Sequence, residues 1–390
     1  MKKTVFAVMI FVVAVGQSIA AGMTTHVFMT EKALQDLEVP ELKQLLEARR
    51  NILFTACNFP DTGTANDYIP GHKGQPNYGG ITHWPPYLES YLAYIQSICR
   101  APYDRHCSRL IAHFMGTAAH NMEDQSFDEL FLAQAAKIAP AETSWMVDAT
   151  SDFVVLGEFS RWDKIPVYVA PVKELKAIFS DMGLNFGYEP ILEGHAMHHF
   201  ATMGERAVTF FGYLPDKKKL PWIAANIYSA PGGVVFTAGL IDRYWESLWH
   251  RLQGRGEEFI PVVSTRPARD ARDVALGSEI NVFFSRGKVC ASITPETFIV
   301  KDGGGQSVPG KVRCAGRTTT DVASFVPASP LRPDQTYSVT LTTGLQDLDG
   351  VQDLCQRYDD LGTCLSDSAY ALRGKPMSRE YSFRFFTVKN

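Results

Sequence analysis

Apolar residues recur at spacings of three and four along most of the chain up to residue 252, which is the period of an amphipathic helix. Glycine, proline and asparagine gather between these stretches, notably at Phe59–Tyr78 and Tyr213–Leu220, and indicate loops. The pattern therefore predicts an all-α domain over residues 22–254. Its expected helices are Glu31–Asp36, Pro40–Arg49, Tyr87–Cys99, Arg109–Gln134, Thr143–Phe159, Val172–Phe179, Pro190–Phe211 and Gly233–Leu252.

The pattern changes near Gly254. Beyond it, short alternating runs rich in Val, Thr and Phe are separated by Gly, Pro and Asp, as in half-buried strands. A series of short strands of this kind is typical of an all-β sandwich. We therefore expect a second domain over residues 255–390, with strands at Glu279–Phe284, Thr297–Lys301, Val322–Val326, Tyr337–Leu341 and Tyr381–Val388.

Residues 1–21 have the features of a secretory signal peptide. Two lysines near the start are followed by an apolar run over Val5–Gly16, and small residues offer cleavage sites after Ala20 or Ala21. The apolar run is short for a membrane-spanning helix, and no later stretch is long and apolar enough to span a membrane. We therefore expect a soluble mature protein that is exported to the periplasm or the extracellular medium.

Charge and cysteine content narrow the class of protein. Lys and Arg total 38 against 42 for Asp and Glu, and this balance argues against a general nucleic-acid-binding protein. Seven cysteines fit an oxidising compartment. Cys99 and Cys107 bracket a short polar loop and could pair, whereas Cys57 is expected to be free and buried. Two further disulfides of undetermined connectivity could form among Cys290, Cys314, Cys355 and Cys364.

One predicted helix carries the strongest chemical signal. His120, Asp124 and Asp128 follow one another at steps of four, so on a helix they lie along one face. Carboxylates in an otherwise apolar helix need a partner when they are buried, and a divalent metal ion would satisfy all three side chains. Asp148 and Asp152 repeat the spacing of four in the next predicted helix. We therefore expect a helical bundle that holds a metal cluster.

Three further candidate ligands lie in the same domain, at His26, Asp61 and His83. Each has an ordinary explanation. His26 could be a cap or surface residue, Asp61 a turn residue after a proline, and His83 a core histidine beside a tryptophan. Together with the helical residues, however, they form an ordered series on separate elements. Imidazoles and carboxylates in combination are suited to zinc.

Several short motifs surround and extend this series. They are Thr25-His26, Phe59-Pro60-Asp61, Thr82-His83-Trp84-x-Pro86, Gly116-x-x-x-His120-x-x-x-Asp124, Pro171–Leu175 and Ala225–Tyr228. In this order they resemble the zinc-dependent phospholipase C family. The similarity looks closest to the catalytic domain of glycosylphosphatidylinositol-specific phospholipase D, and it covers nearly all of residues 22–252.

The resemblance implies an all-α domain that cleaves phosphodiesters with two or three zinc ions. It assigns one zinc ion to Asp61, His83, His120 and Asp124. It assigns another to Asp124 and His26, with the new N-terminus as a further candidate. Asp124 would then bridge two ions, and Asp61, a ligand with a spare oxygen, is the first candidate for the general base.

The third site departs from the family pattern. The family usually has histidine where Asp128 and Asp148 stand, so with Asp152 this site would be made of carboxylates alone. Hard oxygen ligands weaken the preference for zinc and admit Ca²⁺, Mg²⁺ or Mn²⁺. Three histidines of a later helix could supply a missing imidazole, although an ordinary place in the helix is the simpler interpretation; they are His195, His198 and His199.

A second set of motifs runs through the C-terminal part. It consists of Val263–Pro267, Val274–Phe284, Phe325–Leu331, Asp334–Tyr337 and Phe383–Thr387. In this order the motifs resemble the bacterial Ig-like domains of surface and secreted proteins. The resemblance implies a spacer, carrier or binding module without a catalytic group of its own, and it leaves the partner of this domain open.

These resemblances imply a secreted, metal-dependent phospholipase C that hydrolyses the phosphodiester of glycerophospholipids such as phosphatidylcholine. The loop Asp67–Gly80 is expected to touch the bilayer surface, so the expected membrane contact is peripheral. A phospholipase D reaction on the same scaffold stays open, because no residue reports which oxygen leaves. A phosphodiesterase of the single-strand nuclease type is disfavoured by the acidic charge and by the lack of tryptophan in residues 20–40. The last alternative is a non-catalytic Ig-like binding protein.

Overall fold

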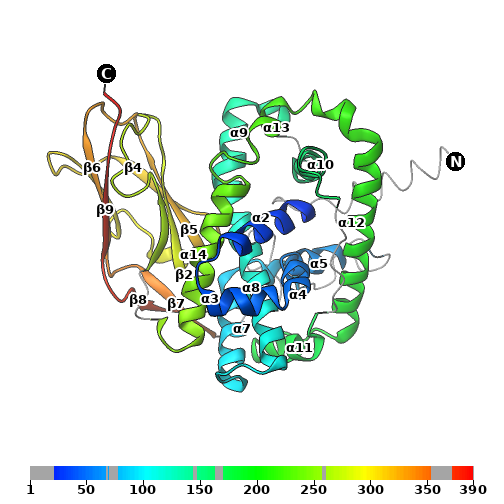
Figure 1. Cartoon of the computed structure of the whole chain (residues 1–390). Coiled ribbons are helices and arrows are strands. Elements are labelled where there is room, and N and C mark those ends of the chain that lie inside the picture. The colour runs from blue at the N-terminus through cyan, green and yellow to red at the C-terminus, as the bar shows by residue number, and fades with distance from the viewer. Residues whose placement is uncertain are drawn as a thin grey trace.

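The computed structural model describes residues 22–66, 69, 78–143, 147–162, 170–256, 261–352 and 371–389. A helical domain lies beside a β-sheet domain, and helix α14 (Val234–Leu252) packs against both (Figure 1). The prediction of an all-α domain followed by an all-β domain is therefore confirmed. The expected signal peptide, most of the loop expected at the bilayer, and two of the cysteines (Cys355 and Cys364) lie outside the described residues. No helix of the described residues is long and apolar enough to cross a membrane.

The helical domain is built around α8 (Arg105–Ser126), which is buried along most of its length. Its apolar residues at steps of four, such as Leu110, Phe114 and Ala118, belong to the main hydrophobic core, so the period that predicts the helix also supplies its packing. Besides α8 and α14, the α-helices of the described residues are α2 (Met23–Asp36), α3 (Pro40–Glu47), α4 (Arg50–Ala56), α5 (Phe59–Ala65), α6 (Gly79–Thr82), α7 (Pro85–Ile98), α9 (Ala133–Ile138), α10 (Val147–Phe159), α11 (Val172–Asp181), α12 (Tyr188–Lys217) and α13 (Pro221–Asn226).

Helix α5 lies where the sequence pattern predicts a loop. Its sequence, FPDTGTA, has no apolar period, so the pattern does not reveal it. Pro60 stands in the first turn, where its fixed φ and missing N–H are tolerated, and a carboxylate in that turn stabilises the positive end of the helix. This short helix carries Asp61 into the interior of the domain.

A π-helix over Phe127–Leu132 follows α8, whereas the sequence predicts one continuous α-helix over Arg109–Gln134. The loop before α14 approaches the chain closely at this point. A Cβ atom at Gly232 would lie 2.7 Å from Ser126 O. Because a π-turn holds more residues than an α-turn, the α-helical spacing that predicts Asp128 on the stripe does not continue through this segment.

The strands of the β-domain form two antiparallel sheets within the described residues. One has the order β4-β5-β2-β7-β8 with β1 paired to β2, and the other has the order β3-β6-β9. Inward-facing side chains such as Ile280, Val339 and Phe385 are fully buried in the shared core, as in a sandwich. The strands are β1 (Val262–Arg266), β2 (Ile280–Val289), β3 (Phe298–Asp302), β4 (Gly310–Cys314), β5 (Thr319–Pro327), β6 (Thr336–Leu341), β7 (Gln346–Gln352), β8 (Ala371–Pro376) and β9 (Tyr381–Phe386).

The two domains share an apolar contact surface. Val263 of β1, Phe283 of β2 and Val322 of β5 belong to the hydrophobic core of the helical domain. Phe283 also packs against Phe236 of α14, with ring centroids 5.9 Å apart. Because these side chains are removed from water only when the domains are joined, they stabilise one relative placement.

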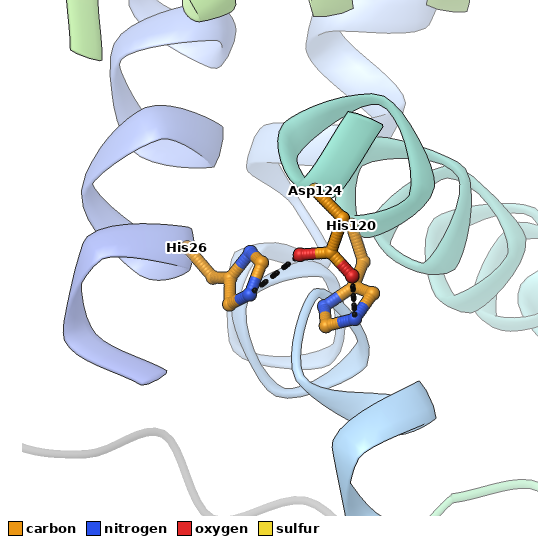
Figure 2. Close-up of side chains that lie close together, drawn as sticks. All are labelled: His26, His120 and Asp124. Carbon is orange, nitrogen blue, oxygen red and sulfur yellow. Dashed lines mark ion pairs between the residues drawn. The ribbon is translucent and has the colours of Figure 1, made fainter. Parts of the chain in front are cut away.

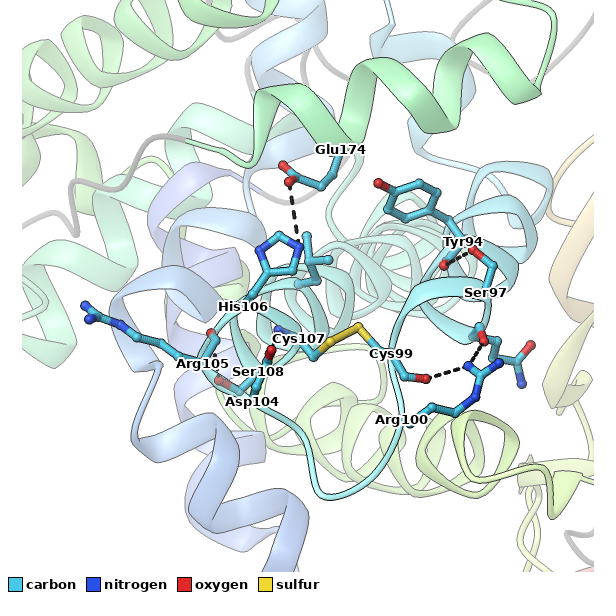
Figure 3. The surroundings of a disulfide bond; sticks show 12 residues. Tyr94, Ser97, Cys99, Arg100, Asp104, Arg105, His106, Cys107, Ser108 and Glu174 are labelled. Carbon is cyan, nitrogen blue, oxygen red and sulfur yellow. Dashed lines mark hydrogen bonds and ion pairs between the residues drawn. A yellow bond between two sulfur atoms is a disulfide. The ribbon is translucent and has the colours of Figure 1, made fainter.

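Two disulfides and one free cysteine lie within the described residues. A disulfide joins Cys99 at the end of α7 to Cys107 in the first turn of α8 (Figure 3). Beside it, Asp104 caps α8 by accepting a hydrogen bond from Cys107 N at 2.7 Å. A second disulfide joins Cys290 to Cys314. The expectation that Cys57 is a free, buried thiol is confirmed.

Candidate metal centre

Five of the candidate ligands come together in the interior of the helical domain. His26 and His120 are fully buried, and only 8% of Asp61 and 9% of Asp124 is exposed. Carboxylates in such a place need charge compensation or a bound cation. The five are His26 of α2, Asp61 of α5, His83 at the end of α6, and His120 and Asp124 of α8.

Asp124 lies between two imidazoles (Figure 2). Its Oδ1 is 3.3 Å from His26 Nε2, and its Oδ2 is 3.2 Å from His120 Nε2. Asp61 repeats this arrangement, with Oδ1 3.4 Å from His83 Nε2 and Oδ2 3.9 Å from His26 Nε2. Each carboxylate therefore has one oxygen near His26 and the other near His83 and His120.

The second ring nitrogen of each imidazole is held by an oxygen. A carbonyl or carboxylate oxygen accepts, so each Nδ1 donates its proton, and the Nε2 atom of each ring faces the two aspartates. Outer hydrogen bonds of this kind fix the orientation of histidines that bind metals. The three contacts are His26 Nδ1 to Glu123 Oε2 at 2.6 Å, His83 Nδ1 to Gly79 O at 2.6 Å, and His120 Nδ1 to Cys57 O at 2.7 Å.

The spacing of these atoms suits a tetrahedral metal ion. With metal–ligand distances of about 2.0–2.2 Å, neighbouring ligand atoms of a tetrahedral site lie about 3.3–3.6 Å apart. The four shortest contacts between the Nε2 atoms and the oxygens of Asp61 and Asp124 span 3.2 Å to 3.6 Å. Within the described residues, His26 Nε2, His120 Nε2 and one oxygen each of Asp61 and Asp124 are buried without a hydrogen bond. The residues present therefore fit a divalent metal ion.

The charges inside the cluster oppose the effect of burial. Burial lowers the pKa of His26, but the hydrogen bond with Glu123 and the nearby carboxylates raise this pKa to about 10. Burial also raises the pKa of Asp61, whereas the neighbouring imidazoles, first that of His120, hold it well below its usual range. Since Asp61 stays ionised, it is in the form that binds a metal ion.

Glu123 is a residue of this site that the spacing of four does not reveal. It precedes Asp124 and therefore points away from the ligand stripe of α8, toward α2. Its fully buried carboxylate accepts from His26 Nδ1 and, at 2.8 Å, from Thr30 Oγ1. Thr30 follows His26 by about one turn of α2. The signal in the sequence is this polar pair on α2, together with a second acid beside Asp124.

Of the three aspartates of the expected third site, the structure describes the side chains of Asp128 and Asp152. Asp128 lies half-buried in the π-helix, and Asp148 lies on α10 with its side chain outside the description. Asp152 is buried and caps the N-terminus of α2, because its oxygens accept from Thr24 N at 3.0 Å and from Thr25 N at 2.8 Å. A third metal site at these positions stays a prediction.

A cavity of about 40 Å³ lies beside the cluster. Its lining includes Asn58 and Thr62, which are near neighbours of Asp61 in the chain, and His195 and His198 of α12. Both histidines are buried, and within the described part of the chain no hydrogen-bond partner reaches their Nε2 atoms. Burial lowers the pKa of His198 to about 4, so it is a neutral imidazole that can exchange a hydrogen bond with a molecule in the cavity.

Comparison with known proteins finds a match to a family model in the C-terminal part of the chain and weak similarity to curated proteins. Residues 258–363 match the family model of the bacterial Ig-like domain, as the C-terminal motifs predict. The chain is also weakly homologous to phosphatidylinositol-glycan-specific phospholipase D. The protein from Rattus norvegicus is 26% identical over 125 residues, which are 30% of this chain and 14% of that protein. The protein from Mus musculus is 24% identical over 257 residues, which are 60% of this chain and 29% of that protein.

The matched segments are therefore the smaller part of these relatives. Among solved structures, domains 1–6 of the surface layer protein SbsC align with 90% of this chain and 46% of that chain, at 13% identity and a TM-score of 0.22. The N-terminal part of SbsC aligns with 77% of this chain and 78% of that chain, at 10% identity and a TM-score of 0.23. TM-scores this low do not indicate a common overall fold.

Proposed function

We propose that this chain is a metal-dependent phospholipase that hydrolyses the phosphodiester of a glycerophospholipid such as phosphatidylcholine by the phospholipase C reaction. The observation that carries the proposal is the pair of aspartates, each with one oxygen toward His26 and the other toward the opposite histidines. The weak homology to a phospholipase supports a phospholipid substrate. Zinc is the proposed metal, because imidazole nitrogens and carboxylate oxygens together suit it.

Each residue of the cluster has a defined task in this proposal. His26, His83 and His120 offer Nε2 lone pairs, and Asp124 joins the two halves of the cluster. Bound divalent ions would offset the negative charge that builds on the phosphate oxygens. Asp61 is the proposed general base, because its carboxylate has a spare oxygen that can take a proton from the attacking water.

The cavity lined by Asn58 and Thr62 is the proposed place for this water. At about 40 Å³ it has room for about three water molecules, so the lipid itself must lie largely outside it. Arg161 and Arg206 also line the cavity, and their positive charge favours an anionic phosphate group. The residues around the opening, rather than the cluster alone, would then select the head group.

We place the substrate in a membrane surface and propose a peripheral contact. The two disulfides of the described residues and the bacterial Ig-like domain fit an exported protein. An exported phospholipase would meet its substrate from the aqueous side, through the loops around the cavity.

A phospholipase D reaction is the second candidate, because the matched relatives are named for it. The two reactions cut the same phosphodiester on opposite sides of phosphorus. They differ in how the substrate lies over the metal centre, and the products distinguish them. Diacylglycerol identifies the C reaction, and phosphatidic acid identifies the D reaction.

The test is metal content by mass spectrometry, together with hydrolysis of phosphatidylcholine vesicles by the purified exported protein. Asp61→Asn and His120→Ala should each lower hydrolysis by at least about a hundredfold, since they remove a ligand and, for Asp61, the proton acceptor. His106→Ala is the matched control, because that imidazole is 53% exposed and pairs with Glu174 (Figure 3). It lies about four turns of α8 before His120.

We expect about two zinc ions per chain in the wild-type protein, one for each half of the cluster. The control should keep both the metal and the activity. A wild-type chain without bound metal and without lipid turnover after addition of zinc and calcium would refute the proposal. In that case the Ig-like domain would become the functional part to study.

A further inference from the structure

The β-domain contacts the helical domain directly beside two candidate metal ligands. Gln125 follows Asp124 in α8, and Trp84 follows His83 at the start of α7. Both side chains are buried, with 4% of Gln125 and 8% of Trp84 exposed. Ligation and domain contact therefore lie on neighbouring residues at two separate places in the helical domain.

Both polar ends of the Gln125 side chain are bonded to strand β5. Its Oε1 accepts hydrogen bonds from Asp321 N at 2.9 Å and from Thr320 Oγ1 at 3.1 Å. Its Nε2 donates to Asp321 Oδ2 at 3.1 Å. A planar amide that is held at both ends has a fixed orientation, so β5 fixes the turn of α8 that carries Asp124.

Asp321 is bonded to the helical domain a second time, through α14. Tyr244 Oη donates to Asp321 Oδ1 at 3.4 Å, and both residues are buried. A buried carboxylate is a costly contact between two domains that already share an apolar surface. This cost favours a role in setting position over a role in adhesion alone.

The segment before β5, at Gly316, contacts Trp84, the residue that follows His83 in the chain. The Trp84 ring packs on the backbone of Gly316, where a Cβ atom would lie 2.7 Å from Trp84 Cζ3. His83 Nε2 in turn lies 3.6 Å from Asp124 Oδ2, in the same half of the cluster. One short stretch of the β-domain therefore supports two ligands that belong together.

We propose that the β-domain positions the metal ligands, with Thr320 and Asp321 acting on Asp124 through Gln125, and Gly316 acting on His83 through Trp84. These are positioning residues, because each acts through the residue next to a ligand. The inference rests on the proposed metal centre. It gives the Ig-like domain a task in the site itself, beyond that of a spacer or binding module.

Zinc affinity of the full exported chain tests this inference without lipid or turnover. Zinc ions alone are titrated against a chromophoric chelator at one pH. Asp321→Ala changes no residue of the helical domain. We expect it to weaken zinc binding about tenfold, as when a metal ligand loses a group that holds it in position. Asp321→Asn should bind within about twofold of wild type, because an amide can accept from Gln125 and donate to Tyr244.

Ser247→Ala is the matched control. Ser247 Oγ donates across the same interface to Ser285 O at 3.0 Å, but it lies on α14, which carries no candidate ligand. Its zinc affinity should equal that of wild type. If Asp321→Ala does not fold, Thr320→Val decides, because it keeps the shape of the side chain and removes one bond to Gln125, with an expected loss of about threefold.

An unchanged zinc affinity in a folded Asp321→Ala would overturn the positioning role, as would an equal loss in the Ser247→Ala control. Where Thr320→Val decides, an unchanged affinity in that variant would do the same. A wild-type chain that binds no zinc would instead refute the proposed metal centre. The two failures are therefore distinguishable in one set of titrations.

Discussion

At the scale of single residues, the candidate metal centre depends on the acceptors behind its histidines as well as on the ligands. For His120 the acceptor of Nδ1 is the backbone carbonyl of Cys57, which a substitution does not remove. For His26 it is the side chain of Glu123. Glu123 is therefore the position where a substitution can separate the orientation of a ligand from ligation itself.

We expect Glu123→Ala to weaken zinc binding about tenfold, because His26 would lose the acceptor that fixes its ring. Glu123→Gln is the control, since its amide oxygen can still accept from His26 Nδ1 while its amide nitrogen donates to Thr30 Oγ1. Titration of each purified variant with zinc against a chelator gives the affinities. Equal affinities for Glu123→Ala and wild type would show that Glu123 does not orient the ligand.

The same scale shows which residues of the site a sequence can reveal. His120 and Asp124 could be predicted because helical spacing places them on one face, and both lie in the cluster. The role of Asp152 could not be predicted in this way. It accepts from Thr25 N, which is 127 positions away in the chain, and no local pattern connects the two.

At the scale of elements, apolar periodicity predicts helices well where the helix packs by its own side chains, as α8 does. It fails where another segment decides the local geometry. The π-helix Phe127–Leu132 is such a case, because the backbone of Gly232 lies against it. The prediction also misses helix α5, because its short sequence has no apolar period by which a helix could be recognised.

Two glycines with similar backbone angles test how the π-helix is held. Gly232 has φ 79° and Gly183 has φ 75°, a region where a side chain costs about 1 kcal/mol. A Cβ atom at Gly183 would meet no atom within 4 Å, whereas one at Gly232 would lie 2.6 Å from Phe131 N. Gly183→Ala should therefore lower the free energy of unfolding by about 1 kcal/mol, and Gly232→Ala by a further 1–3 kcal/mol or so.

Urea titrations of both variants and of wild type, under the same conditions, give these free energies. The comparison removes the shared cost of the backbone angle and leaves the cost of the contact with the π-helix. Equal losses in the two variants would mean that the loop before α14 does not press on this helix in solution.

At the scale of the whole molecule, the sequence predicts the class of both domains but not how they meet. Gln125 and Asp321 are polar residues that composition alone would assign to the surface, yet both are buried between the domains. These two residues bond to each other although they are 196 positions apart in the chain. Such contacts follow from the docked arrangement of two complete folds, which the periodicity of either fold does not contain.

The burial of Asp321 at this contact makes stability depend on pH. Burial raises the pKa of Asp321 from 3.8 to about 6, although the hydrogen bond from Gln125 opposes the rise. Between these two values the folded chain holds a proton that the unfolded chain has released. Because the folded state binds more protons there, the free energy of unfolding falls as pH rises through this window, by about 3 kcal/mol in all.

Asp321→Asn should remove this contribution, because an amide is uncharged at every pH. In urea titrations with a chelator present, so that metal binding does not contribute, the variant and wild type should be equally stable near pH 4, while near pH 7 the variant should be more stable by about 3 kcal/mol. The difference between the two proteins isolates this group from all others that titrate in the same range. Parallel pH profiles would contradict the burial of this carboxylate between the domains, and with it the proposed positioning role of Asp321.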